Sequence, residues 1–119
     1  MNQSCKKLIL LELNEVNFDV VERYVKADAA RFPAFKRLLD GKRIRTSAER
    51  KYEELEPWIQ WPSVHTAEPY AKHGIFRLGD IVGSAIPQIF EKIENMGFKV
   101  GVVSAMNAEN RLVNPSYFI

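Results

Sequence analysis

Two short apolar runs constrain the fold of this 119-residue chain more than any other feature. Residues 7–13 (KLILLEL) and 98–104 (FKVGVVS) are rich in aliphatic side chains and lack the spacing of an amphipathic helix. Such runs are typical of strands buried on both faces of a parallel sheet. Residues 43–48 could add a short strand. The sequence therefore predicts an α/β fold, a three-layer sandwich with a mostly parallel sheet and helices on both faces.

The segments between these runs carry signals for helix starts and ends. Asn17 or Asp19 can cap a first helix, because their side-chain oxygens accept hydrogen bonds from first-turn N–H groups. Pro33 suits the first turn of a second helix, and Gly41 suits its end. A later helix is expected from about Pro87 to Met96. Helices placed between short strands are the order expected of an α/β domain.

The stretch from Pro57 to Asp80 holds both tryptophans and both histidines of the chain. Pro62 is predicted to start a helix there, with Ser63 and Thr66 in the first turn and Gly74 at the end. The unpaired N–H groups of a helix N-terminus favour negative charge, and a hydroxyl placed there is a plausible nucleophile. The alternative is that both hydroxyls only cap or decorate the helix, and the spacing leaves that alternative open.

Charge, the length of the apolar runs and cysteine content limit the partners and the compartment that we expect. The chain has 17 basic and 15 acidic residues, and a net charge of +2 gives no basis for nucleic-acid binding. Its apolar runs are far shorter than the roughly 20 residues that span a bilayer. Cys5 is the single cysteine, so no disulfide can form within the chain. We therefore expect a cytoplasmic protein without nucleic-acid or membrane partners.

No complete catalytic or metal-binding motif occurs in the sequence. CxxC pairs, HExxH, a P-loop and GxGxxG are all absent. Glu12, Asn14 and Glu15 lie around the predicted carboxyl end of the first strand, which is where ligands bind in open α/β sheets. Their oxygens could supply one or two ligands to a divalent metal, because hard cations prefer oxygen. They could not complete a site alone.

Four segments, taken in order, resemble the alkaline phosphatase-like superfamily, and most closely its type I phosphodiesterase and nucleotide pyrophosphatase branch. The segments are LILLELNEVNFDVV, FPAFKRLLDG, WPSVHTAEPYAKHGI and IFEKIENMGFKVGVVS. They are similar to the first strand running into Asp-Gly, the helix that ends at a glycine, the aromatic-Pro, Thr-Gly and His-Gly-Ile motifs, and the next helix and strand. The resemblance covers most of the chain and implies an alkaline phosphatase-like core that is incomplete here.

The resemblance also implies a chemistry, the hydrolysis of a small phosphate or sulfate ester by two divalent metals, here zinc, manganese or magnesium. Asn14 stands where the family has its first metal-ligand Asp, and Glu15 stands where it has Gly. Both are predicted metal ligands.

The hydroxyl nucleophile of the family has no direct counterpart, since Gln60 stands in its place. Ser63 is the first choice as nucleophile and Thr66 the second. Gln60 and His65, beside these hydroxyls, are predicted to contact the substrate.

Two further positions can be carried over from the family's motifs. Ala67 replaces the glycine of Thr-Gly, and His73 matches the histidine of His-Gly-Ile. That histidine is a motif residue of the family and not a metal ligand.

Some ligands that the family needs do not occur in the sequence. No Asp-His pair is present, and no histidine follows His73. Residues 1–119 are therefore predicted to form a single domain, the N-terminal part of a longer hydrolase-like protein, inactive as the isolated chain. One alternative is a non-catalytic α/β binding or interaction module that dimerises through exposed sheet edges. Another is a small flavodoxin-like domain whose likeness to the hydrolases is only topological.

Overall fold

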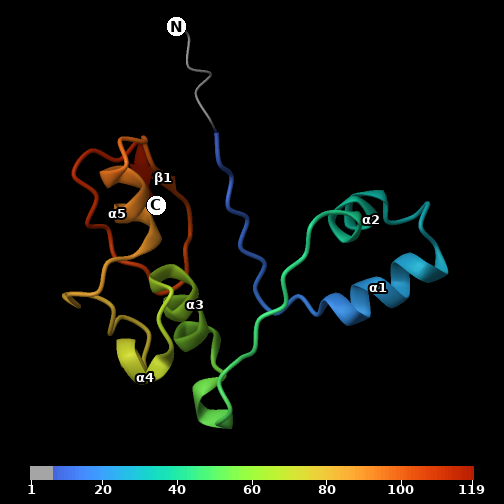
Figure 1. The fold of residues 1–119 in the computed structure, drawn as a ribbon, viewed down its shortest axis with the longest axis horizontal. Coiled ribbons are helices and arrows are strands. Elements are labelled where there is room, and N and C mark those ends of the chain that lie inside the picture. The colour runs from blue at the N-terminus through green and yellow to red at the C-terminus, as the bar shows by residue number, and fades with distance from the viewer. Residues whose placement is uncertain (1–6) are drawn as a thin grey trace, which may run out of the picture. The chain divides into compact units, whose positions relative to one another are not determined.

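A computed structural model describes residues 7–119 and divides the chain into two compact units (Figure 1). The N-terminal unit ends at Arg45, and the C-terminal unit is Thr46–Ile119. Cys5 lies outside the described residues. Between residues 7 and 119, no helix has the length and apolar character needed to cross a bilayer.

The N-terminal unit contains two helices, α1 (Phe18–Ala27) and α2 (Pro33–Asp40). Asn17 is the N-cap of α1, and its side-chain oxygen accepts two backbone N–H groups of the first turn at 3.0 and 3.1 Å. The second helix starts with its proline and has Gly41 as its C-cap. The start of α1 and both ends of α2 agree with the prediction, because caps and prolines act over a few neighbouring residues.

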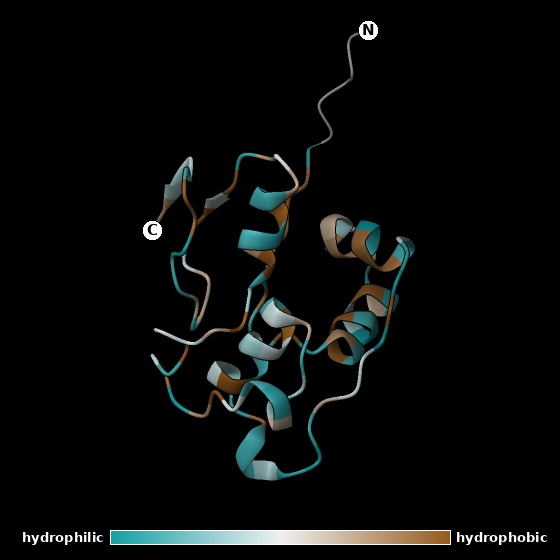
Figure 2. Ribbon diagram, turned by 60° about the vertical axis from the view of Figure 1, so that its left-hand side comes forward, coloured by the Kyte–Doolittle hydropathy of each residue, from teal (hydrophilic) through white to brown (hydrophobic). Residues whose placement is uncertain are grey.

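The facing sides of α1 and α2 form an apolar groove. Six side chains line it: Val20, Val21, Tyr24, Val25, Phe32 and Phe35. Tyr24 and Phe32 meet edge to face, with ring centroids 6.1 Å apart. Both helices carry hydrophobic and hydrophilic residues along their length (Figure 2). Among residues 7–45, however, only Val25 is buried, so these two helices enclose little core of their own.

The first apolar run does not form the predicted strand. Residues 7–13 belong to no helix or strand, and the side chains of Leu8, Ile9, Leu10 and Leu11 are exposed. Residues 43–48 form no strand either. An apolar run becomes a strand only when another strand receives its backbone hydrogen bonds. No strand of the described chain pairs with either segment, so both predictions were wrong.

The C-terminal unit is also mainly helical. Its elements are a 3₁₀ turn η1 (Tyr52–Glu54), α3 (Pro57–Thr66), α4 (Tyr70–His73), α5 (Ile89–Asn95), β1 (Gly101–Val102) and β2 (Tyr117–Phe118). The strands pair in parallel, with Gly101 opposite Tyr117. The second apolar run, 98–104, thus contributes only two residues to a strand.

The three-layer α/β sandwich is therefore overturned. The described residues form a mostly helical structure with one small parallel pair of strands. Both apolar runs were expected to be strands of one mostly parallel sheet. Their composition was typical of strands, but the pairing that builds a sheet is non-local and composition does not encode it.

One apolar cluster holds α5 against the strand pair. Phe90, Val100 and Val102 are buried at its centre. Six partly buried side chains surround them: Ile89, Ile93, Ala105, Ala108, Leu112 and Phe118. The helix starts at a capping box between Gln88 and Glu91. Met96, at which the predicted helix was to end, is the C-cap of α5 and is 72% exposed.

Candidate functional site

Helix α3, which carries most of the predicted site residues, begins at Pro57 and not at Pro62. Ser63 and Thr66 therefore lie in its later turns, and the prediction of an anion site at a helix start beside Pro62 was wrong. Either proline suits a first turn. Pro57 takes that place, with Glu56 in extended conformation as the N-cap, and Pro62 is buried inside the helix.

Asn107 compensates for the proline inside α3. Pro62 has no N–H, so the carbonyl of Trp58 one turn earlier lacks its helical donor. The side-chain nitrogen of Asn107 donates to that carbonyl at 2.6 Å and to the carbonyl of Arg77 at 3.2 Å. Its side-chain oxygen accepts the N–H of Gly79 at 2.9 Å. One buried amide thus repairs the helix and fixes the loop after α4 against it.

The predicted nucleophile Ser63 is in hydrogen-bond contact with the imidazole of His73. The Ser63 Oγ lies 2.9 Å from Nε2 of His73, and the ring of His73 is buried. The other ring nitrogen, Nδ1, accepts the backbone N–H of Ile75 at 3.0 Å. Since Nδ1 accepts, a neutral ring must carry its proton on Nε2 and donate it to Ser63.

This tautomer limits what the Ser63–His73 pair can do chemically. A general base must accept the hydroxyl proton at Nε2, and here Nε2 already carries one. The pair therefore does not have the arrangement of a serine–histidine general-base dyad. Nε2 of His73 can instead donate a hydrogen bond to Ser63, and this bond stabilises negative charge on the serine oxygen. The hydroxyl itself has the carbonyl of Ile59 as a distant acceptor at 3.5 Å.

Burial keeps His73 neutral. Loss of solvent contact lowers the pKa of His73 from its ordinary value, and the nearby carboxylate of Glu49 offsets only part of that effect. The edge of the Tyr70 ring also contacts the imidazole, with centroids 5.7 Å apart. Glu49 is positioned by the N–H of Tyr70, which donates to it at 2.9 Å.

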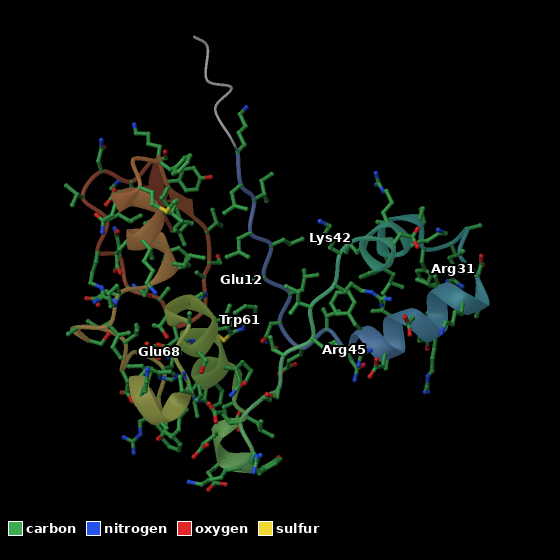
Figure 3. All side chains as sticks on the ribbon, in the orientation of Figure 1. Glu12, Arg31, Lys42, Arg45, Trp61 and Glu68 are labelled. Atoms are coloured by element: carbon green, nitrogen blue, oxygen red, sulfur yellow. The ribbon has the colours of Figure 1, made fainter. Side chains whose placement is uncertain are left out.

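The Thr66 hydroxyl is occupied at the end of α3. It donates to the carbonyl of Pro62 at 2.7 Å and accepts the N–H of Glu68 at 3.3 Å. Figure 3 shows Glu68 in the segment between α3 and α4. The Thr66 residue is 2% exposed, and the next residue, Ala67, has a left-handed φ of 60°. These contacts favour the role that the sequence left open, in which Thr66 ends the helix.

Gln60 and His65, the predicted substrate contacts, both lie within packed structure. The side-chain nitrogen of Gln60 donates to the carbonyl of Glu54 at 2.7 Å, which ties η1 to α3. His65 is 1% exposed, and its ring lies 5.9 Å from that of Trp61 and 5.1 Å from that of Phe90. A substrate would reach His65 only if these aromatic neighbours moved.

Asn14 and Glu15, the predicted metal ligands, form an exposed turn before α1. Glu15 has a left-handed φ of 56°. Within residues 7–119, no group of three or more His, Cys, Asp or Glu side chains lies close enough to hold a metal ion. The turn belongs to the N-terminal unit, whereas Ser63 belongs to the C-terminal unit. Metal binding at Asn14 and Glu15 stays a prediction.

A second network, which is partly buried, fixes the loop before α5, and the sequence reasoning did not identify it. The Arg111 guanidinium donates to the carbonyls of Ser84 and Ile86, and its Nε lies 2.8 Å from a carboxylate oxygen of Glu91. Its signal in the sequence is a run of mostly polar residues, 106–111, shortly after the second apolar run. Both Asn107 and Arg111 lie in that run of polar residues and bind backbone carbonyls.

The chain matches no protein-family model, no curated protein and no solved structure. Function must therefore be argued from the geometry of these residues and from the series of motifs in the sequence.

Proposed function

We propose that this chain is the N-terminal segment of a metal-dependent hydrolase of phosphoric or sulfuric esters, with Ser63 as the nucleophile. The backbone at three glycine positions of the resembled motifs supports this proposal. Glu15, Ala67 and Gly74 stand at those positions, and their φ angles are 56°, 60° and 63°. Residues other than glycine rarely adopt such angles. The backbone therefore keeps the left-handed conformation that glycine favours, even at Glu15 and Ala67.

The contacts of Ser63 suit this role better than those of Thr66. The Ser63 side chain is half-buried, and it receives the Nε2–H of His73 at 2.9 Å. A donor aimed at Oγ stabilises the alkoxide more than the neutral hydroxyl, so it lowers the free energy of the attacking form. His73 acts in this proposal as a fixed donor and not as a base.

Asn14 and Glu15 would hold the metal, as oxygen donors on an exposed turn. Their amide and carboxylate oxygens suit a hard divalent cation, although an amide binds more weakly than a carboxylate. A zinc, manganese or magnesium ion held there would supply a Lewis acid that neutralises charge on an ester oxygen. The family's Asp-His pair and later histidine do not occur in the sequence, so the proposal takes these ligands from a longer chain.

Titration calorimetry with zinc, manganese and magnesium tests the metal-binding part of the proposal. We expect weak binding that Asn14→Ala abolishes. Asn110→Ala, which removes an exposed amide in the other unit, is the matched control and should bind as the wild type does. Binding that survives Asn14→Ala, or no binding even at high metal concentration, would remove Asn14 from the site. We expect no ester hydrolysis by the isolated chain with any of the three metals.

The Ser63 part of the proposal can be tested without metal. In a Cys5→Ala background, Ser63→Cys places a single thiol beside Nε2 of His73. We expect its pKa to fall about one unit below the ordinary value of about 8.5, because the Nε2–H stabilises the thiolate. The rate of iodoacetamide alkylation as a function of pH measures that pKa.

Val64→Cys in the same background is the matched control for that thiol. It lies next to Ser63 on α3, is 54% exposed, and should keep an ordinary thiol pKa. Adding His73→Asn to Ser63→Cys should raise the thiol pKa again, since the donor at Nε2 is lost. Equal pKa values for the two thiols would contradict the activating role of His73.

A second candidate function is a non-catalytic module that associates with itself. The observation that favours it is the exposed run Leu8, Ile9, Leu10 and Leu11, whose exposed fractions are 74%, 89%, 53% and 70%. Contiguous exposed apolar residues often mark an interface. Sedimentation equilibrium should then show a dimer that Ile9→Lys dissociates and Val113→Lys, at an isolated site that is 93% exposed, does not. A monomer over a wide range of concentration would exclude this candidate.

A further inference from the structure

We propose that His73 is an acid-sensitive latch, whose neutral imidazole holds α4 and the backbone at Ile75 against α3 and whose protonation releases them. This inference goes beyond the proposed function. It depends on the contacts of one buried ring and holds whether or not Ser63 attacks an ester.

The latch depends on the opposite hydrogen-bond roles of the two ring nitrogens of His73. Nδ1 must accept the N–H of Ile75, 3.0 Å away, and Nε2 must donate to Ser63 Oγ, 2.9 Å away. Only the neutral tautomer with its proton on Nε2 meets both demands. The ring thereby joins α3 to the segment that follows α4. Because His73 is 6% exposed and Ile75 is 4% exposed, water cannot readily replace either hydrogen bond.

Protonation of His73 would break the hydrogen bond between Nδ1 and the Ile75 N–H. A second proton must go to Nδ1, where the new N–H would face the N–H of Ile75. Two donors cannot share a hydrogen bond, so the Ile75 amide would lose its acceptor. The ring would also become a buried cation. Gly74, with a left-handed φ of 63°, lies between the two residues and gives the backbone a flexible point at which to move.

The charged groups around the imidazole do not reverse this outcome. Glu49, from the segment before η1, favours the charged ring, but burial outweighs it and lowers the pKa of His73. Ser63, on α3, contributes no charge, and His65 on the same helix lies against Trp61 and Phe90. The remaining groups are held elsewhere: Lys72 pairs with Glu68 at 2.9 Å, and Asp80 accepts the N–H groups of Phe76 and Arg77.

The direction of the pH effect follows from the lowered pKa of His73. The unfolded chain binds the proton at the ordinary histidine pKa of about 6.5, whereas the latched state binds it only at lower pH. The latch therefore contributes its full stability above about pH 6.5. That contribution is lost as the pH falls from there through the pKa of the latched state.

Nuclear magnetic resonance on the wild-type chain tests the latch directly. The ring nitrogen shifts should show the Nε2–H tautomer, and His73 should titrate below its ordinary pKa. Between about pH 7.5 and about pH 5.5, a range that brackets histidine titration, the protection of the Ile75 amide against hydrogen exchange should fall about tenfold after correction for intrinsic exchange. The buried amide of Val102 should keep its protection.

His73→Asn is the matched variant, because its side-chain oxygen can still accept the Ile75 N–H but does not titrate. Its Ile75 protection should be independent of pH over the same range. An Nδ1–H tautomer, titration at or above the ordinary pKa, or a loss of Ile75 protection that only parallels that of Val102 would overturn the latch. Metal and ester are absent from these measurements, so failure of the latch leaves the metal-binding part of the proposed function to its own test.

Discussion

Each of the two units is stabilised internally by a different kind of polar contact. In the N-terminal unit, the polar contacts lie at the surface. Arg45 pairs with Asp19 at 2.9 Å, for example, although their side chains are 80% and 72% exposed. In the C-terminal unit, buried side chains such as Asn107 and Gln88 bind backbone groups distant in sequence.

This difference in polar contacts should appear in the free energy of unfolding of each unit. An exposed ion pair contributes about 0–1 kcal/mol, because water screens it and already solvates both charges. A buried polar group is costly to leave without a partner, so a buried amide with several backbone partners has a larger effect. We therefore expect the polar contacts of the C-terminal unit to dominate its stability, and those of the N-terminal unit to contribute little.

Removing Asn107 should give the largest effect. Asn107→Ala leaves the carbonyls of Trp58 and Arg77 and the N–H of Gly79 without their partner, and it keeps a left-handed φ of 50° at an alanine. We expect a loss of about 4 kcal/mol in the free energy of unfolding, since each buried group costs about 1–3 kcal/mol. Urea unfolding followed by tryptophan fluorescence measures it, because both tryptophans lie in the C-terminal unit.

Asn110→Ala is the control for Asn107. The exposed Asn110 accepts a single hydrogen bond, from the N–H of Leu112 at 3.2 Å. Its removal should cost less than about 1 kcal/mol. Similar losses from the two variants would mean that Asn107 does not repair the helix at Pro62 as we infer.

The same substitution in each unit compares their cores. Val102→Ala removes a buried side chain from the cluster around Phe90, and we expect it to cost about 2 kcal/mol in lost burial and cavity formation. Val25→Ala acts in the groove of the N-terminal unit, which solvent can reach, so we expect about 1 kcal/mol there. Hydrogen exchange of the α1 and α5 amides measures the two effects separately. An equal or larger cost for Val25 would contradict the weaker core.

Replacing the two residues that stand at glycine positions should have the smallest effect, with equal size in both units. Glu15→Gly and Ala67→Gly relieve left-handed φ angles of 56° and 60°. We expect each to stabilise its unit by about 0.5–1 kcal/mol, because left-handed strain is local. Thermal unfolding and hydrogen exchange would show the gain.

Ala85→Gly is the matched control for these glycine substitutions. Ala85 is exposed and does not have a positive φ, so its replacement should destabilise the chain slightly. A stabilising effect of Ala85→Gly would show that the gains at the other two positions do not come from their backbone angles.

The sequence predicted features that depend on neighbouring residues. The cap at Asn17 and the end of α2 at Gly41 follow from side chains and backbone angles within a few positions. A helix also ends at Gly74, but it is the short α4 and not the single helix expected from Pro62. The sequence also marked Ser63 as the first choice of nucleophile, but His73 entered only as a motif residue. Nothing in the spacing of Ser63 and His73 indicated a hydrogen bond, because the chain turns at Ala67 between them.

Sequence by itself determined the start of α1 and both ends of α2, because caps, prolines and glycines act through local hydrogen bonds and dihedral angles. Only the tertiary structure decided which proline starts α3. Pro57 and Pro62 are equivalent as local signals, and Asn107, far along the chain, makes the second one tolerable inside the helix. The tertiary structure likewise decided that the apolar runs build no large sheet among residues 7–119. Strand pairing is a property of two distant segments, and neither segment specifies it alone.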